Sequence, residues 1–338
     1  MCGIVGISSE THVASSIYES LLMLQHRGQD AAGMVVCDNE GRLHSRKSMG
    51  YVRDVFHQSH MNKLVGHYGI GHVRYPTAGG AGKEFAQPMY VNSPYGISLA
   101  HNGNLTNSKV LARELFHAEM RHLNTDSDSE VLLNIFAHEL GKQRAILPST
   151  KHFFQAVKKT HSRCHGAYAV LALITGFGLL AFRDPRGIRP LVIGERQGKT
   201  QKEYIIASEN SSFSALGYTT LRDVNPGEAV FIDTQGQLHS QQCADNPEPT
   251  PCLFEYVYLA RPDSTLDEIS VYKARMRMGQ KLANKITKLK KLSLQFTIII
   301  FVQIIYLCFF IYFYFFHEKS FNNIIFSVLF FKCFGTGN

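Results

Sequence analysis

The sequence predicts an α/β (α+β) fold in which two packed sheets carry helices on their outer faces. Short apolar runs of strand length recur along the chain, and turn sequences rich in glycine, proline and asparagine separate them. A few longer stretches have the apolar spacing of an amphipathic helix instead. With 338 residues, of which 45% are hydrophobic, the chain can bury a sizeable core and form two domains.

The N-terminal third alternates between strands and helices. A helix is predicted over 13–24, because apolar residues recur on one face at helical spacing. A second helix is predicted over 54–64. Strands are predicted at 2–7, 32–38, 68–75 and 96–101, and the last of these ends at a turn formed by Asn102-Gly103-Asn104.

The middle of the chain continues with two helices and then a series of strands. The helices are predicted over 107–121 and 127–140, and the second begins with capping-box spacing between Ser127 and Glu130. Five strands follow, separated by "DPRG" and "NPG" turns, at 167–174, 178–184, 190–195, 203–208 and 228–233. The proline-rich segment 246–251 is predicted to be a linker.

Charge and cysteine content exclude several classes of function. The net charge is +8, but no run of basic residues interleaves with aromatic residues, so no nucleic-acid partner is expected. The seven cysteines are odd in number and widely spaced, without a C-x-x-C pair, so neither a disulfide framework nor a metal site is expected. A reducing, cytoplasmic location fits this pattern best.

The composition changes near Thr287. Residues 292–316 contain no charge, and 294–316 is long enough to be a candidate transmembrane segment after a lysine-rich stretch. The tail is also rich in Phe, Ile, Tyr, Asn and Lys, as expected of translated AT-rich, non-coding sequence. Two explanations therefore remain, a membrane anchor or a frameshift or read-through product. We therefore divide the chain into a first domain (2–250), the start of a second domain (251–287) and a divergent apolar tail (288–338).

Cys2 raises a specific question because it follows the initiator methionine directly. The simpler interpretation is a small residue that begins a buried strand. The alternative is that Met1 is removed and Cys2 becomes the amino terminus, with a thiol and a free α-amine on one residue. The amine has a pKa of about 7.7–8.0 and can take the proton of the thiol.

Three further motifs carry polar groups that suit amide chemistry. Arg74 ends a strand and can clamp a carboxylate. Asn102 and Gly103 offer a side-chain amide and a backbone N–H for an oxyanion, although Asn-Gly is more often a tight turn. Asp128 can bind an ammonium group, although its simpler role is in a helix cap. The segment "RYPTAGGAGKE" lacks the phosphate-loop spacing, so a glycine-rich loop that closes over a ligand is expected.

The phrases "MCGIVGI", "LQHRGQDAAG", "GHVRYPTAG", "AHNGNLTN", "TDSDSE" and "AFRDPRGIRPLVIG" together resemble the class II glutamine amidotransferases. More narrowly they resemble the amidophosphoribosyltransferase family, which starts purine synthesis from glutamine and phosphoribosyl pyrophosphate. The resemblance runs from Met1 to about Thr287. It implies a four-layer α-β-β-α sandwich of the N-terminal-nucleophile type, followed by the start of a phosphoribosyltransferase domain.

The resemblance also implies roles for individual residues. Cys2 is the nucleophile that hydrolyses glutamine to glutamate and ammonia, and Asn102 and Gly103 stabilise the oxyanion. The residues expected to bind glutamine or to lie close to Cys2 are Arg74, Asp128, Thr77 and Arg27. No iron–sulfur cluster is expected, although some relatives use a cysteine at the position of Cys252. Full-length members use Mg²⁺ in the transferase domain and are expected to form homo-oligomers.

The sequence departs from the family after Thr287. A pattern like "DDSIVRGTT", which cradles the 5-phosphate of phosphoribosyl pyrophosphate, is expected there and is not found. The transferase half is therefore expected to be absent, and phosphoribosyl pyrophosphate is not expected to bind. Three hypotheses remain: a glutaminase half-enzyme, a related amidotransferase with another acceptor, and a truncated or membrane-attached product without activity.

Overall fold

The computed structural model describes residues 2–76, 80, 82–288 and 303–305. The chain divides after Ala274 into two compact units, which are described separately. The first unit thus includes residues 251–274, whereas the domain boundary predicted from the sequence lies after residue 250. The assignment of 251–287 to the start of a phosphoribosyltransferase domain stays a prediction.

A seven-stranded antiparallel sheet forms one half of the first unit. Its strand order is β11-β9-β10-β1-β4-β2-β3, so the N-terminal strand β1 lies in the centre between β10 and β4. The strands are β1 (Gly3–Ser8), β2 (Ala31–Cys37), β3 (Leu43–Met49), β4 (Tyr68–Arg74), β9 (Val192–Gln197), β10 (Lys202–Ala207) and β11 (Thr219–Asp223).

A six-stranded antiparallel sheet packs against the first sheet, in the order β13-β12-β8-β7-β6-β5. Its strands are β5 (Met89–Val91), β6 (Ile97–Leu105), β7 (Gly166–Ile174), β8 (Gly178–Arg183), β12 (Glu228–Asp233) and β13 (Leu238–Gln242). Apolar side chains from both sheets fill the space between them, among them Ile4, Ile70, Leu171, Leu179 and Ile206.

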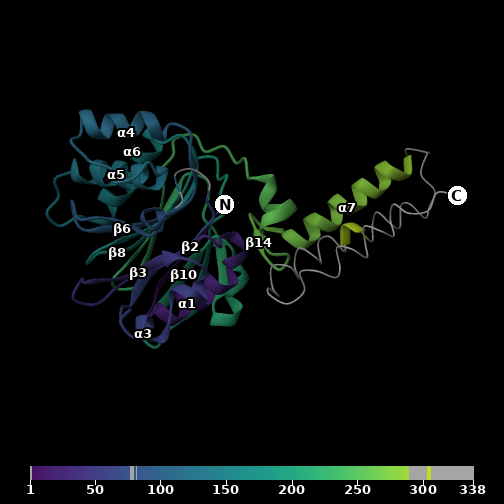
Figure 1. Ribbon diagram of the computed structural model, residues 1–338, viewed down its shortest axis with the longest axis horizontal. Helices are drawn as coiled ribbons and strands as arrows, with labels where there is room; N and C mark the ends of the chain where they lie inside the picture. Colours follow the sequence, from purple (N-terminus) through teal and green to yellow (C-terminus); the bar gives the residue numbers. More distant parts are fainter. Residues whose placement is uncertain (1, 77–79, 81, 289–302, 306–338) are drawn as a thin grey trace. The chain divides into compact units, whose positions relative to one another are not determined.

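Helices cover the outer faces, so that four layers follow one another in Figure 1. The seven-stranded sheet carries α1 (Ala14–Met23), α2 (Val52–Val55) and α3 (Gln58–Met61); the six-stranded sheet carries α4 (Ser108–His117), α5 (Asp128–Gly141) and α6 (Thr150–Arg163). Helix α1 lies very close to β4, because a Cβ on Gly71 would come within 2.6 Å of Ile17 Cγ2. A second core lies under α5 and α6 and includes Phe136, Phe153, Phe182 and Phe231.

Shorter elements complete the described chain. They are η1 (Gln25–Arg27), η2 (Lys83–Phe85), η3 (Asn210–Ser212), η4 (Ser214–Leu216), the π-helical turn η5 (Glu255–Leu259), and the hairpin of β14 (Thr265–Leu266) and β15 (Ile269–Ser270). Helix α7 (Val271–Lys288) begins in the first unit and continues in the second.

Two sequence predictions are corrected by the structure. The single helix predicted over 54–64 is wrong, because His57 is extended (φ −85°, ψ 164°) and separates α2 from α3. The predicted turn at Asn102-Gly103-Asn104 is also wrong. Strand β6 continues through these residues to Leu105 and pairs with β7, with Gly103 opposite Tyr168.

Several elements were not predicted from the sequence. Strands β3, β11 and β13 carry many polar, partly exposed residues at sheet edges, and β5 has only three residues, so their periodicity is weak. Helix α6 was missed although its buried Phe153, Phe154 and Val157 have helical spacing. The other predicted helices and strands are present within a few residues of the expected limits.

The predicted membrane segment 294–316 lies outside the described residues, apart from 303–305. In the part of the chain that the structure describes, no helix has both the length and the apolar character required to cross a membrane. The described cysteines, which are Cys2, Cys37, Cys164, Cys243 and Cys252, are all free thiols.

Candidate active site

Cys2 lies immediately before β1 and is only 6% exposed. Its backbone nitrogen donates a hydrogen bond to Asn102 Oδ1 at 3.1 Å. Its sulfur accepts from the backbone nitrogen of Tyr75 at 3.4 Å, and the thiol can donate to the carbonyl oxygen of the same residue at 3.6 Å. Cys2 is thus held from both sheets, its sulfur by Tyr75 after β4 and its backbone nitrogen by Asn102 on β6.

The surroundings of the Cys2 thiol oppose its ionisation. Burial raises the pKa of the thiol, and the backbone contact with Tyr75 and the charge of Arg74 reduce this effect without cancelling it. At neutral pH the thiol is therefore protonated, and a nearby base must take its proton before it can attack a carbon atom.

Asn102 and Gly103 lie on β6, opposite the start of β1. The Asn102 side chain is fully buried, and its Oδ1 faces the nitrogen of Cys2. Its Nδ2 has no hydrogen-bond partner among the described residues, which is unusual for a buried donor. Gly103 cannot be replaced without movement, because a Cβ there would lie 1.9 Å from the carbonyl oxygen of Ala167.

Arg74 ends β4 and is 4% exposed. One terminal nitrogen pairs with Asp30 Oδ2 at 2.5 Å, and the other donates to the carbonyl oxygen of Gly80 at 2.9 Å. The guanidinium also lies over the ring of Phe85, 5.2 Å from its centre. Arg74 therefore ties the end of β4 to the segment around Gly80, and its remaining N–H groups can still bind a carboxylate.

Asp128 is the first residue of α5 and is 6% exposed. Its Oδ2 accepts from the backbone nitrogen of Leu105 at 2.9 Å, which links the helix to the end of β6. The positive end of the helix dipole stabilises a carboxylate at this position. The second carboxylate oxygen can accept a hydrogen bond from an ammonium group.

The predicted capping box at this helix forms only in part. Ser127 is the N-cap, and its hydroxyl accepts from the backbone nitrogen of Ser129. Glu130 does not reach back to the cap, because its carboxylate accepts from the backbone nitrogens of Asn124 and Thr125 instead. Glu130 thereby holds the loop that precedes the helix.

Arg27 lies behind Cys2 and is completely buried. Its Nε donates to the carbonyl oxygen of Cys2 at 3.0 Å, and its terminal nitrogens pair with Glu209 and with both oxygens of Glu255. Burial alone would lower the pKa of Arg27, but the charges of Glu255 and Glu209 outweigh it, so the group stays charged. These contacts hold the backbone of Cys2; a contact between Arg27 and glutamine stays a prediction.

Thr77 lies outside the described residues, as do 78, 79 and 81, so its expected place in the glutamine loop stays a prediction. Sequence reasoning did not single out Tyr75, Asp30, Glu209 or Glu255. Tyr75 and Asp30 lie within the quoted phrases "GHVRYPTAG" and "LQHRGQDAAG", so these phrases could have indicated them. Glu209 and Glu255 have no comparable signal, because they meet Arg27 across more than 180 residues of chain.

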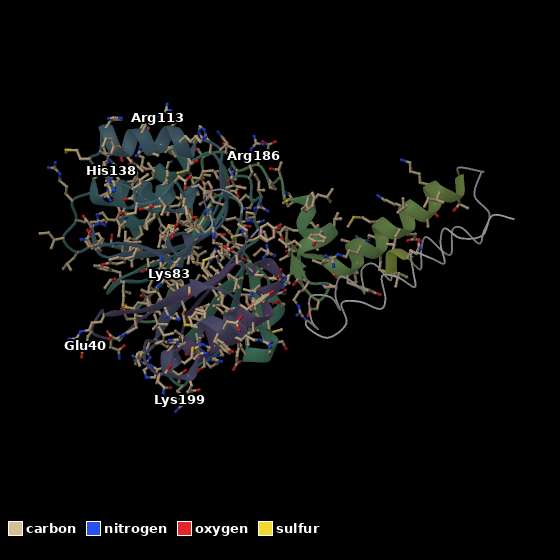
Figure 2. All side chains as sticks on the ribbon, viewed as in Figure 1. Glu40, Lys83, Arg113, His138, Arg186 and Lys199 are labelled. Carbon is tan, nitrogen blue, oxygen red and sulfur yellow. The ribbon has the colours of Figure 1, made fainter. Side chains whose placement is uncertain are left out.

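One group of possible metal ligands lies in the described helical layer, far along the chain from Cys2. Glu119, His138 and Glu139 bring their ligand atoms within 4.8 Å of one another, and His138 is visible at the edge of this layer in Figure 2. Arg163 already pairs with both carboxylates, at 2.8 Å and 2.7 Å. The guanidinium therefore supplies the positive charge that a metal ion would otherwise bring.

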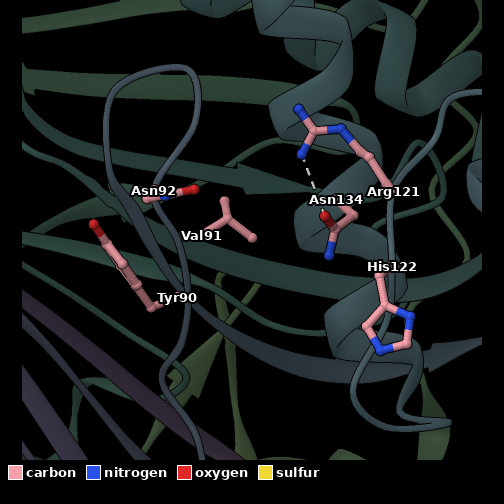
Figure 3. A pocket seen from close by; sticks show the side chains of 6 residues that line it. All are labelled: Tyr90, Val91, Asn92, Arg121, His122 and Asn134. Carbon is pink, nitrogen blue, oxygen red and sulfur yellow. Dashed lines mark hydrogen bonds between the residues drawn. The ribbon is translucent and has the colours of Figure 1, made fainter.

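A polar pocket of about 370 Å³ lies beside β5 and contains none of the predicted site residues. Its lining side chains, shown in Figure 3, are Tyr90, Val91, Asn92, Arg121, His122 and Asn134. Arg121 donates to Asn134 Oδ1 at 3.3 Å across one side of the pocket. The groups suited to amide chemistry lie instead around Cys2.

Comparison with known proteins gives consistent matches. A family model described as a glutamine amidotransferase domain matches residues 80–215. Proteins named amidophosphoribosyltransferase from Pseudomonas aeruginosa and Escherichia coli are 57% and 55% identical over 85% of this chain. The chain spans 57% of the length of these relatives.

Solved structures agree with these matches. The glutamine phosphoribosylpyrophosphate amidotransferase from B. subtilis, complexed with ADP and GMP, superimposes with a TM-score of 0.72 at 36% identity. It covers 84% of this chain, which covers 58% of it. A structure described as the allosteric regulatory enzyme of purine biosynthesis gives a TM-score of 0.74 at 37% identity, with the same coverage. The predicted four-layer sandwich is confirmed.

Proposed function

Because this chain aligns over 85% of its length with proteins named amidophosphoribosyltransferase, at 57% identity to the Pseudomonas aeruginosa protein, we propose that its first unit hydrolyses glutamine to glutamate and ammonia. Cys2 is the nucleophile in this proposal, after removal of Met1. The α-amine of Cys2 then accepts the thiol proton, directly or through a water molecule, which overcomes the raised pKa of the buried thiol.

The thiolate sulfur attacks the side-chain amide carbon of glutamine, and the C=O electrons move to the oxygen. Asn102 Nδ2 and the backbone N–H of Gly103 donate to this oxyanion. The tetrahedral intermediate collapses as the C–N bond breaks, and the amide nitrogen leaves as ammonia with the proton held by the amine. Water then attacks the thioester, which releases glutamate and restores the thiol.

The observation that carries the proposal is the pairing of Cys2 with Asn102. The oxygen of this side chain accepts from the nitrogen of Cys2, whereas its buried Nδ2 has no partner among the described residues. A buried, unused donor next to a thiol suits an oxygen that becomes negative only during the reaction. A buried asparagine with a structural role ordinarily has hydrogen-bond partners at both ends of its amide.

Arg74 and Asp128 complete the proposed glutamine site as clamps for the α-carboxylate and the α-ammonium group. They approach Cys2 from different elements, and the charges of both act on its thiol. Thr77 is proposed to belong to the loop that closes over glutamine. We further propose that the released ammonia serves a phosphoribosyl acceptor, the reaction for which the relatives are named.

The proposal is tested by measuring glutamate release from glutamine by the full chain, together with mass spectrometry of its N-terminal peptide. We expect a peptide that begins at Cys2, and saturable hydrolysis that stops when Cys2 is alkylated. The matched control is a preparation that retains Met1, which should be inactive because an amide nitrogen is not a base. Normal turnover by that preparation would refute the amine as the base, and no turnover by either would refute the hydrolysis.

A further inference from the structure

Asn102 and Asp128 belong to different elements, yet one ligand must touch both of them. Asn102 lies on β6, whereas Asp128 begins α5. The bond from the backbone nitrogen of Leu105 to Asp128 joins these elements at one point. A second connection lies beside it and uses residues for which the proposed mechanism has no role.

Gln87, His101 and Ser129 form this second connection, as a closed ring of hydrogen bonds. The Gln87 side chain donates from Nε2 to Ser129 Oγ at 2.9 Å and accepts the backbone N–H of His101 at 2.7 Å. His101 Nδ1 lies 3.0 Å from the same Ser129 hydroxyl. All three residues are at least 95% buried, so water does not compete for these bonds.

The ring touches the proposed site through the chain itself. His101 immediately precedes Asn102, and Ser129 immediately follows Asp128. Gln87 reaches both from the segment before β5, which is otherwise the edge of the six-stranded sheet. One side chain therefore bridges the residue before the oxyanion donor and the residue after the ammonium clamp.

Each bond of the ring connects a hydrogen-bond donor with an acceptor when the imidazole of His101 is neutral. Burial lowers the pKa of His101, so its imidazole is neutral at neutral pH. Ser129 Oγ accepts from Gln87 Nε2, and it forms a second hydrogen bond with His101 Nδ1, in which either atom can be the donor. Removing the side chain of Ser129 or Gln87 therefore leaves buried polar atoms of the other two residues without a partner.

We propose that Gln87 and Ser129 are positioning residues, which through His101 hold the oxyanion donors of β6 at a fixed distance from the ammonium clamp Asp128. This inference rests on the proposed glutamine hydrolysis. It predicts that breaking the ring affects binding and turnover together, since both ends of the site then move. The reactivity of the thiol toward small reagents should change little, because the sulfur of Cys2 is held by Tyr75 after β4 and not by β6.

The test compares Ser129→Ala, Gln87→Met and the double variant with the full-length wild-type chain. Either single variant should lower kcat by about tenfold to a hundredfold, as expected of a small displacement of catalytic groups, and should raise KM for glutamine. Alkylation of Cys2 by iodoacetamide should stay within about twofold of the wild-type rate. The double variant should lose little more than the worse single variant, because both substitutions break one ring.

Ser127→Ala is the matched control, because it removes a hydroxyl from the same helix start without breaking the ring. It should lower the melting temperature through loss of the N-cap, but leave kcat and KM near wild type. If Ser129→Ala does not fold, Gln87→Met tests the ring from its other side. Wild-type kinetics in Gln87→Met, multiplicative losses in the double variant, or equal losses in Ser127→Ala would each overturn this inference alone. A wild-type chain without glutaminase activity would overturn the proposed function and this inference with it.

Discussion

The seven-stranded sheet and the six-stranded sheet contribute to the proposed site in different ways. The first carries Cys2 and Arg74, and both have protein partners that hold them, Tyr75 and Asp30. The second carries Asn102, whose Nδ2 has no partner among the described residues. One sheet thus holds the attacking group in place, whereas the other leaves a donor ready for charge that develops later.

The proposed site therefore requires both sheets, because one supplies the nucleophile and the other supplies the oxyanion donor. Substitution of Cys2 beside the first sheet should remove the reaction, whereas substitution of Asn102 on the second sheet or of Asp128 on the helix that covers it should slow the reaction or weaken binding. Four predictions test this division, beginning with the largest expected effect.

Cys2→Ala should reduce glutamine hydrolysis to the detection limit while leaving the fold intact, because no other group can form the thioester. Glutamate release and circular dichroism measure the two parts of this statement. Cys37→Ala is the matched control, since Cys37 is also a buried free thiol on the seven-stranded sheet. If Cys2→Ala hydrolysed glutamine at a rate close to that of Cys37→Ala, Cys2 would not be the nucleophile.

Asn102→Ala should lower kcat by about a hundredfold to a thousandfold, the range measured when one oxyanion donor is removed. Cys2 should remain reactive toward iodoacetamide, because its sulfur is held by Tyr75. Asn104→Ala, an exposed asparagine on the same strand, provides the control for changes in β6. A loss of alkylation in Asn102→Ala as large as the loss of turnover would show that Asn102 only holds the nucleophile.

Asp128→Ala should raise KM for glutamine by roughly tenfold to a hundredfold, because it leaves a charged ligand group unpaired. The alkylation rate with a reagent that lacks the α-ammonium group should change much less. Asp126→Ala, which removes an exposed acid from the loop just before α5, is the control. An unchanged KM in Asp128→Ala would remove this carboxylate from the site.

The smallest predicted effect concerns pH and compares a buried histidine on each side of the molecule. Burial lowers the pKa of His72 on β4 to about 3 and that of His161 on α6 to about 4. The unfolded chain binds these protons near pH 6.5, so the folded state loses stability as the pH falls below this value. Between pH 7.5 and 5.5 each histidine should lower the free energy of unfolding by about 1.4 kcal/mol.

Denaturant titrations of wild type, His72→Gln and His161→Gln at the two pH values measure these contributions. Each substitution should reduce the pH-dependent change in the free energy of unfolding by about 1.4 kcal/mol. The two reductions should add, because the residues belong to different layers. A pH dependence that neither substitution reduces would mean that other groups control stability in this range.

The sequence predicted the residue types of the site better than their partners. Cys2, Asn102 and Asp128 could be chosen because each chemical role requires a particular group near a recognisable motif. The Asn-Gly pair was nevertheless expected to form a turn, since local preference favours one, and pairing with β7 overrides that preference in the structure. Arg27 and Glu255 are 228 residues apart in the sequence, and no local sequence pattern predicts a contact at that separation.

The central place of β1 has a consequence for the timing of maturation. β1 pairs with β10, whose Ala207 lies opposite Val5, so the strand cannot be enclosed before residue 207 has been synthesised. At about 5–20 residues per second the ribosome needs roughly 10–40 s to reach that point. Cys2 is buried once the sheet closes, so the proposed removal of Met1 by an aminopeptidase is expected within this interval. In the proposed mechanism, a chain that closes its sheet first keeps an amide where the base should be.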